Sequence, residues 1–140
     1  MERHDQEVGS SAAAMMEERI GALLQHRDQI EEALFHGGNT RTFSGLVSEV
    51  YRGDAQVFFN EGAVIVSQLE DTEVGHRAVH LWLCAGELES VMPLTDEALD
   101  WGKDMGATVA TSIGRRGWER LPAVKERGWK PDLTFYVKEL

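Results

Sequence analysis

The sequence predicts a mixed α/β domain with a central, mostly antiparallel sheet and helices on both of its faces. Two amphipathic helical segments precede any strand, and the strand candidates that follow are separated by short turns. Residues 77 to 84 carry apolar side chains on both faces of the strand, which is typical of a central strand covered on both sides. A length of 140 residues fits one such domain.

The first helical period runs from about Met15 to His36 and follows a stretch without hydrophobic periodicity. We expect that stretch, residues 1 to 14, to be a flexible arm, and residues 15 to 140 to form one domain. Thr42 is a suitable N-cap for a second helix, which Gly53 would end.

Three strand candidates follow, at residues 55 to 60, 63 to 70 and 77 to 84. The short link between the first two favours an antiparallel hairpin. In the third strand, alternation places Val79, Leu81 and Leu83 on one face. The other face would then carry Ala78, His80, Trp82 and Cys84.

Beyond Gly86 the period becomes helical as far as Gly106, and Pro93 predicts either a kink or the first turn of a second helical segment. The remaining expected elements are a strand at 107 to 112, a helix around 116 to 127 and a final strand at 133 to 138.

Composition excludes several classes of function. A formal net charge of −10 disfavours wholesale binding to nucleic acid or to an anionic membrane. The lone Cys84 excludes an internal disulfide and a cysteine-rich zinc module, and at a strand end it is ordinarily a small buried hydrophobe. His76 and His80 would lie about 13 Å apart on a strand, so we expect no metal site. Without a membrane-length apolar stretch or signal peptide, we expect a protein inside a cell or a particle.

The charge is unevenly distributed along the chain. Residues 113 to 140 carry a net +3, so the preceding residues carry −13. Three arginines, Arg115, Arg116 and Arg120, gather where a glycine-flanked turn starts a helix, which suits a phosphate, a CoA 3′-phosphate or an acidic partner. The alternative is that they pair with the acidic N-terminal helices of the same chain.

Over about residues 18 to 140, the order of elements resembles the GNAT superfamily of acetyl-CoA-dependent N-acetyltransferases. The motifs that carry the resemblance are Leu81 to Leu88, Gly106-Ala107-Thr108, Gly114 to Leu121, Gly128-Trp129-Lys130-Pro131 and the closing Lys138-Glu139-Leu140. They look like those of small GNAT-like proteins of tailed phages and prophages. That resemblance implies a GNAT-like fold and a place in the virion or the host cytoplasm.

In active GNAT members, the third of these strands is followed by an Arg or Gln and a glycine-rich turn. The N–H groups of that turn hold the cofactor pyrophosphate at a helix N-terminus. This turn has one glycine and no Arg or Gln, and its carboxylates, Glu87 and Glu89, would repel a diphosphate or occupy the anion site themselves. The candidate cofactor-binding residues are Gly86, Leu88, Arg115 and Arg116.

Many active members also place a tyrosine four residues before a Gly-aromatic pair, where it protonates the departing thiolate. Here that position is Val124, although Tyr136 on the last expected strand could approach from elsewhere. The candidates for a general base are Glu61, Glu70 and His80. The competing interpretations are that the glutamate in the hairpin turn, Glu61, is simply solvated and that His80 is a histidine of the core.

Two hypotheses follow from the resemblance. The degraded turn and Val124 favour a non-catalytic phage protein, without a cofactor, that binds virion or assembly proteins, and a homo-oligomer is compatible with this hypothesis. The alternative is a divergent acetyl-CoA-dependent N-acetyltransferase with Glu70 or His80 as base and Tyr136 or water as acid. An open cleft between the strands that end near Glu70 and Cys84 would favour the cofactor.

Overall fold

The structure is a computed structural model that describes residues 2–114 and 117–140, with side chains from Ser11 onward. The helices are α1 (Glu2–Gln25), α2 (Arg27–His36), α3 (Phe43–Arg52), α4 (Leu88–Asp104), the short 3₁₀ helix η1 (Trp118–Arg120) and α5 (Pro122–Glu126). The strands are β1 (Gln56–Phe59), β2 (Ala63–Asp71), β3 (Arg77–Gly86) and β4 (Val109–Ser112).

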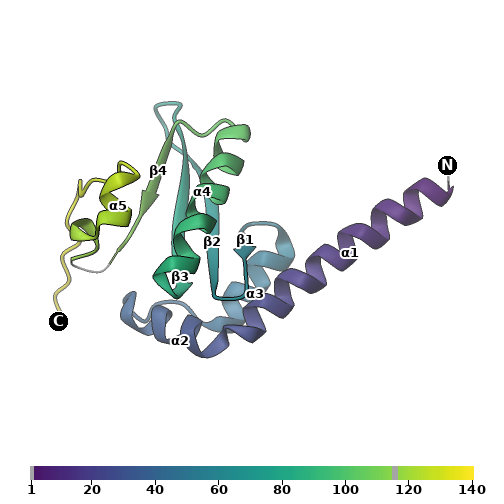
Figure 1. The fold of residues 1–140 in the computed structure, drawn as a ribbon, viewed down its shortest axis with the longest axis horizontal. Coiled ribbons are helices and arrows are strands. Elements are labelled where there is room, and N and C mark those ends of the chain that lie inside the picture. The colour runs from purple at the N-terminus through teal and green to yellow at the C-terminus, as the bar shows by residue number, and fades with distance from the viewer. Residues whose placement is uncertain (1, 115–116) are drawn as a thin grey trace.

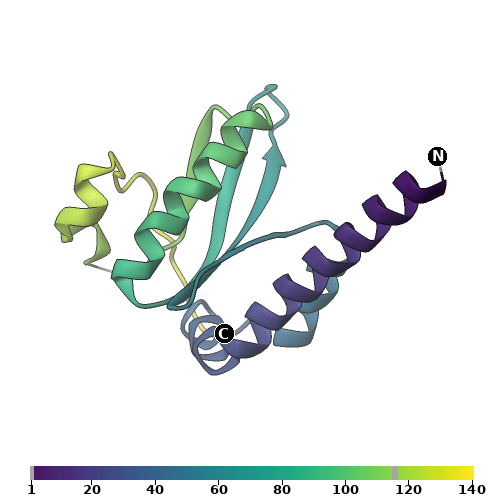
Figure 2. The same cartoon turned by 45° about the vertical axis from the view of Figure 1, so that its right-hand side comes forward.

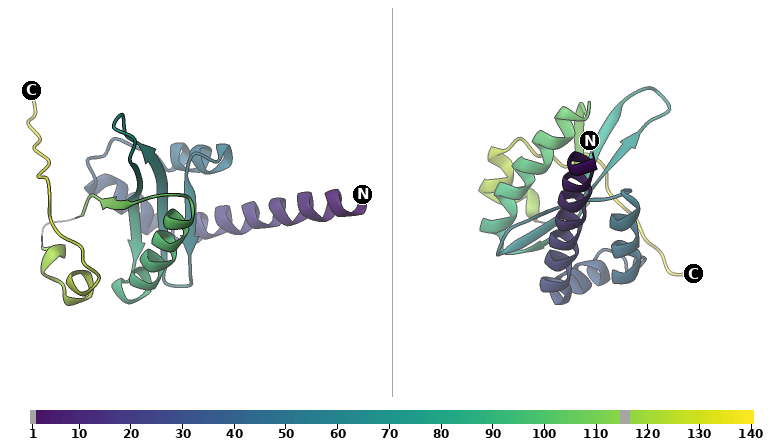
Figure 3. Two further views of the ribbon diagram at one scale, coloured as in Figure 1. Left: turned by 90° about the horizontal axis from the view of Figure 1, so that it is seen from above. Right: turned by 90° about the vertical axis from the view of Figure 1, so that its right-hand side faces the viewer.

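The strands form one sheet in the order β1-β2-β3-β4 (Figure 1). β1 and β2 pair antiparallel, as do β2 and β3, whereas β3 and β4 pair parallel. Helices α2 and α3 lie on one side of the sheet and α4 lies on the other (Figures 2 and 3). The predicted fold class is therefore confirmed.

Each face of the sheet has its own apolar core. The core on the α2/α3 face contains Leu23, Ile30, Leu46, Val50, Val64, Val66, Leu83 and Ala85. The core on the α4 face contains Ala63, Ile65, Val79, Leu81, Val91, Leu94 and Ala98, with Trp101 and Trp129 packed against it. Burial on both faces fixes the register of β2, because a one-residue slip would exchange the two sets of side chains.

The N-terminal region differs from the expected arm and single helix. Helix α1 already begins at Glu2 and projects from the rest of the molecule, so most of the expected arm is helical here (Figure 1). The helical run then breaks at His26, and α2 begins at the next residue, Arg27. The buried His26 ring lies 3.0 Å from Gln29 Oε1 and 3.4 Å from the Asn60 carbonyl oxygen. The division into an arm and a domain stays a prediction.

Strand β3 contains one residue more than its partner. Val66 of β2 lies opposite Leu83, but the next residue, Ser67, lies opposite Leu81, so Trp82 is the extra residue of a β-bulge. Val79 and Leu81 face α4, whereas Leu83 packs in the core on the other side. Our expectation that Val79, Leu81 and Leu83 share one face is therefore wrong, because the extra residue shifts the alternation by one.

The chain after α4 also differs from the expectation. Helix α4 is continuous through Pro93, and β4 starts at Val109. In place of the helix expected around 116 to 127 there are η1 and the short α5, which begins with Pro122.

The strand expected at 133 to 138 is not formed in this structure. Leu133, Phe135 and Val137 are 92%, 78% and 77% exposed. The alternating apolar pattern of this segment suits a strand. A strand also needs a neighbouring strand for its backbone hydrogen bonds, and no described strand pairs with residues 133 to 138.

The docking of α4 on β3 gives a first testable prediction. A Cβ on Gly102 would lie 2.7 Å from Cβ of Val79, so Gly102→Ala should lower the free energy of unfolding by about 1–3 kcal/mol through overpacking. Gly21→Ala in α1 is the matched control, since a Cβ there meets open space. That variant should gain up to about 1 kcal/mol from helix propensity. Urea unfolding measures both, and Val79→Ala should partly rescue Gly102→Ala. Equal stability of both glycine variants would contradict the close approach.

Candidate functional site

The distinctive feature of the sheet is a fork between β3 and β4. These strands pair from Ala78 opposite Val109 to Leu81 opposite Ser112, and their ladder ends there. β3 nevertheless remains paired with β2 as far as Gly86. Residues 82 to 86 of β3 therefore lie beyond the ladder with β4, and β4 turns away toward α5 (Figure 1). The fork leaves this edge of β3 without a neighbouring strand as far as the N-terminus of α4.

Trp82, the bulge residue, is the first residue of β3 past the fork. Its indole Nε1 is buried and has no hydrogen-bond partner among the described residues. The guanidinium carbon of Arg41 lies 4.2 Å from the ring centroid, in the geometry of a cation–π contact. The indole is thus held at the fork on the α2/α3 face of the sheet.

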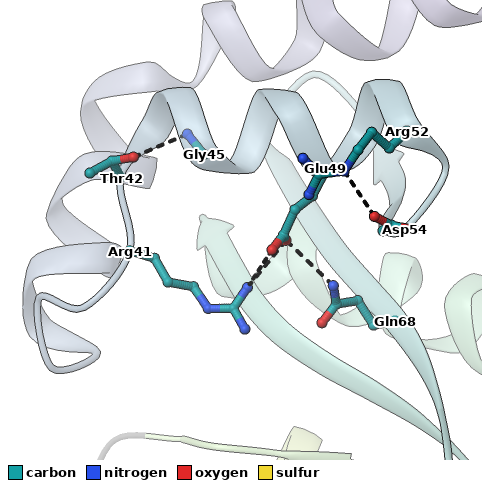
Figure 4. A network of polar contacts seen from close by, with 7 residues as sticks. All are labelled: Arg41, Thr42, Gly45, Glu49, Arg52, Asp54 and Gln68. Atoms are coloured by element: carbon teal, nitrogen blue, oxygen red, sulfur yellow. Dashed lines mark hydrogen bonds and ion pairs between the residues drawn. The ribbon is translucent and has the colours of Figure 1, made fainter.

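Arg41 is itself held by a polar network (Figure 4). Its Nη1 donates to Glu49 Oε2 at 3.2 Å, and Gln68 Nε2 donates to the same oxygen at 3.4 Å. Thr42 caps α3 by accepting from the Gly45 N–H at 3.0 Å, which fixes the backbone next to Arg41. The Arg41–Glu49 pair is partly exposed, so its contribution to stability is modest, on the order of 0.5 kcal/mol.

His80 belongs to the last but one residue pair that joins β3 to β4 before the fork. Its Nδ1 is 2.8 Å from Thr111 Oγ1 on β4, directly across the ladder. The ring is only partly buried, so the interpretation as a core histidine is wrong. The hydrogen bond to Thr111 fixes the orientation of the imidazole next to the unpaired edge of β3.

Glu70 shares a sheet face with His80. Gln68 lies opposite His80, and Glu70, two residues further along β2, lies opposite Ala78. Diagonal neighbours of this kind are about 7–8 Å apart. The carboxylate of Glu70 is exposed, whereas Glu61 lies in the turn between β1 and β2. The structure therefore brings Glu70 and His80 to one face.

Tyr136 is not brought to that face. Its side chain is 88% exposed in the C-terminal region, which leaves the ring without the packing that would hold it near His80. Val124, at the position of the family's tyrosine, is buried in α5.

The turn after β3 depends on Gly86. Its φ is +121°, and a Cβ there would overlap the Gly62 carbonyl oxygen and lie 2.6 Å from Ala63 Cα. Substituting Gly86 would therefore disturb the sheet as well as any ligand. Glu87, the N-cap of α4, makes no side-chain hydrogen bond to the helix, so it does not occupy the helix-end anion site.

Only some of the other residues that we expected to bind an anionic ligand lie in the described part of the chain. Leu88 is the first residue of α4, next to Gly86, whereas Arg115 and Arg116 lie outside the described residues. Arg120 is exposed and makes no ion pair within the described part of the chain. Arg127 of the same region pairs with Asp96 on α4 at 3.1 Å, not with the N-terminal helices.

A cleft between the strands ending near Glu70 and Cys84, which would have favoured the cofactor, is not formed. Those strands, β2 and β3, are paired along their whole length, and Glu70 and Cys84 lie toward opposite ends of the ladder. The part of β3 that lacks a neighbouring strand lies instead along its other edge, past the ladder with β4. The sequence gives no motif for Arg41, Glu49 or Thr111, which come from a loop, a helix and the next strand. The adjacent large residues Trp82 and Leu83 are the one signal that could have indicated the bulge.

Cys84 packs against the core on the α4 face, and burial raises the pKa of its thiol to about 12. A thiol with that pKa is almost entirely protonated at neutral pH, so it is a poor nucleophile.

Among residues 2–114 and 117–140, no three His, Cys, Asp or Glu side chains are grouped so that they could hold a metal ion. No helix in the same part of the chain is both long and apolar enough to cross a membrane.

No family model matches the sequence, and no curated protein matches it either. Solved structures do match the fold. A protein of Bacillus halodurans superposes with a TM-score of 0.63 at 14% identity, over 89% of this chain and 96% of that chain. An aminoglycoside acetyltransferase from an uncultured soil metagenomic sample, solved with sisomicin, gives 0.62 at 11% identity, over 84% and 88%. A Trypanosoma brucei acetyltransferase gives 0.58 at 12% identity, over 86% and 94%.

Identities this low show the fold alone. The chain therefore has the GNAT-like fold of acetyltransferases, as the resemblance in its sequence implied. The phage origin and the place in a virion stay predictions.

The buried thiol gives a prediction about pH and stability. The folded state raises the pKa of Cys84 from 9.0 to about 12, so the protonated thiol stabilises the fold fully below pH 9. That stabilisation is lost as the pH rises from about 9 to 12, because the unfolded chain ionises first. Between pH 8 and pH 10.5, wild type should lose about 2 kcal/mol more unfolding free energy than Cys84→Ala. Urea unfolding at the two pH values tests this, and parallel losses in both proteins would show that the thiol is not desolvated.

Proposed function

We propose that this chain is a divergent acetyl-CoA-dependent N-acetyltransferase. The observation that carries the proposal is the fork, where β3 extends for residues 82 to 86 past its last pair with β4 and then enters α4 through Gly86. The GNAT-like fold of the matching acetyltransferases supports the same function. Acetyl-CoA would supply the acetyl group as an activated thioester.

The unpaired edge of β3 suits an extended ligand that carries amides. Backbone groups there can bind such a chain as an added strand would bind. At the end of the edge, the first N–H groups of α4 form a site for a phosphate group, and Glu87 does not fill it. The fit is incomplete, because the turn has only one glycine and Glu89 is an exposed carboxylate in the first turn.

His80 is the residue that we assign as the general base. His80 Nδ1 lies 2.8 Å from Thr111 Oγ1, and in the tautomer that carries its proton on Nδ1 and donates it to this hydroxyl, Nε2 is the proton acceptor. An acceptor amine that reaches the fork loses a proton to His80 while its nitrogen bonds to the thioester carbonyl carbon. The carbon–sulfur bond would then break and the thiolate would take a proton from water. The imidazolium of His80 would return its proton to the hydroxide so formed, which restores the base. Glu70 lies on the same face and is the second candidate.

A non-catalytic role with protein partners in a phage particle or its assembly remains the competing hypothesis. The observation that favours it is the acidic turn, because the negative charges of Glu87 and Glu89, both exposed next to the N-terminus of α4, would repel a diphosphate there. A measurement of acetyl-CoA binding separates the two hypotheses.

The acidic turn gives the first prediction of the proposal. Glu89→Lys removes a repulsive charge and adds an attractive one, so acetyl-CoA should bind about 3- to 30-fold more tightly, with the gain shrinking at high salt. Glu97→Lys is the matched control, since Glu97 is exposed on the same helix but more than two turns from its N-terminus. Calorimetry measures both. If neither wild type nor Glu89→Lys binds acetyl-CoA, the proposed function is wrong.

The second prediction concerns the base. His80→Gln should lower the acetyl transfer rate to a primary amine by about 10²- to 10⁴-fold while leaving acetyl-CoA affinity unchanged, and imidazole should restore part of the rate. Release of CoA thiol reports the rate. His76→Gln, in the exposed turn between β2 and β3, is the control and should keep full activity. If Glu70→Gln abolishes the rate and His80→Gln does not, Glu70 is the base.

A further inference from the structure

The turn between β1 and β2 meets the first turn of α4 at one end of the sheet (Figure 1). The Glu87 N–H donates to the Gly62 carbonyl oxygen at 3.1 Å, which joins the N-cap of α4 to this turn. Asn60 Nδ2 donates to the Ser90 carbonyl oxygen at 2.9 Å, which joins the first helical turn to it as well. A Cβ on Gly62 would lie 2.8 Å from Ser90 Cβ, so the two segments are in direct contact.

The side chain of Asn60 is itself held in place. Its Oδ1 accepts from the Gly62 N–H at 3.0 Å. Its backbone N–H donates to the Ala63 carbonyl oxygen at 3.0 Å, and its own carbonyl oxygen lies 3.4 Å from Nε2 of the buried His26. Because an amide oxygen accepts and an amide nitrogen donates, the contact of Oδ1 with the Gly62 N–H leaves Nδ2 to donate to Ser90.

The first turn of α4 needs support from outside the helix. Pro93 has no N–H, so it cannot donate to the carbonyl oxygen of Glu89, four residues earlier. That turn is therefore joined to the rest of the helix by one hydrogen bond fewer than an ordinary first turn. The bond from Asn60 reaches the next carbonyl along, that of Ser90, and ties the turn to the sheet instead.

The same turn carries two backbone donors that are left without partners. The N–H groups of Ser90 and Val91 both donate to the Glu87 carbonyl oxygen, at 2.9 and 2.8 Å. Those of Leu88 and Glu89 have no hydrogen-bond partner among the described residues. These two N–H groups are the donors that remain for a phosphate at this helix end, and they move with the first turn.

We propose that Asn60 is a positioning residue for acetyl-CoA. By holding the Ser90 carbonyl, it keeps the first turn of α4 where the N–H groups of Leu88 and Glu89 can bind a phosphate of the cofactor. This role depends on the proposed function, since it concerns the same phosphate site. Asn60 itself touches neither the cofactor nor the reacting atoms, and it acts through the backbone of α4.

Asn60→Ala tests this role. Loss of the bond to Ser90 should weaken acetyl-CoA binding about 10-fold, because the two phosphate donors are no longer held in place. The kcat with a primary amine as acceptor should stay the same, since His80 lies on β3, outside this turn. Calorimetry measures the affinity, and release of CoA thiol measures kcat.

Thr72→Ala is the matched control. Thr72 Oγ1 accepts from the His76 N–H at 3.1 Å in the turn between β2 and β3, at the other end of the sheet. This variant also loses one side-chain hydrogen bond of a hairpin turn, but it should bind acetyl-CoA as tightly as wild type.

Acetyl-pantetheine separates positioning from general damage, because it carries the same thioester as acetyl-CoA but no phosphate. Its kcat/KM should be equal in wild type and Asn60→Ala. An equal loss with both acetyl donors would show that the substitution disturbs the whole site, and it would overturn the positioning role.

Gly62→Ala provides a second route that leaves Asn60 in place. The added Cβ would overlap the Ser90 side chain, so it should displace the first turn of α4 and weaken acetyl-CoA binding, again without an effect on acetyl-pantetheine. Ser90→Gly in the same chain removes the overlapping atoms and should restore most of the affinity. If Asn60→Ala does not fold, this pair decides, and unchanged acetyl-CoA affinity in Gly62→Ala would overturn the role.

The affinities also separate this role from the proposed function. If wild type binds acetyl-CoA and Asn60→Ala binds it equally well, Asn60 does not position the phosphate site, and the proposed function stands. If wild type does not bind acetyl-CoA, both the function and the role of Asn60 are overturned.

Discussion

The extra residue in β3 is the constraint on which the candidate site depends. Because Trp82 interrupts the alternation, the first half of β3 packs its large side chains against α4, and the second half packs them under α2 and α3. The ladder with β4 ends at the residue just before the bulge, whereas the ladder with β2 continues past it. One local distortion therefore divides the core, opens the fork and presents the Trp82 ring to Arg41.

Close packing at glycines fixes the other end of the fork. Gly86 passes so near the start of β2 that no side chain fits, and Gly62 meets Ser90 in the first turn of α4 in the same way. Gly102 allows the far end of α4 to approach Val79 equally closely. The helix is thus held against β3 near both ends, which keeps its N-terminal N–H groups beside the unpaired strand edge. The position of the proposed phosphate site follows from this packing, although the acidic residues around it do not favour an anion.

The sequence predicted the helices and strands better than it predicted their register and the contacts between them. Helix α3, with Thr42 as its cap, and strands β1 to β3 follow from local patterns that the structure confirms. The bulge could not be placed, because both faces of β3 are apolar and a shift of one residue leaves the composition of each face almost unchanged. The contact of His80 with Thr111 joins residues 31 apart, and nothing in their local sequence marks it. The strand predicted at 133 to 138 has the alternating pattern of a strand, but no described strand pairs with it.

Strand β4 holds the candidate base in place. It is four residues long and mostly exposed, and its four pairs with β3 hold Thr111 against the imidazole of His80. A strand this short, paired on only one edge among the described strands, is weakly held. The orientation of His80, and with it the proton transfer assigned to Nε2, therefore depends on four residue pairs at the edge of the sheet.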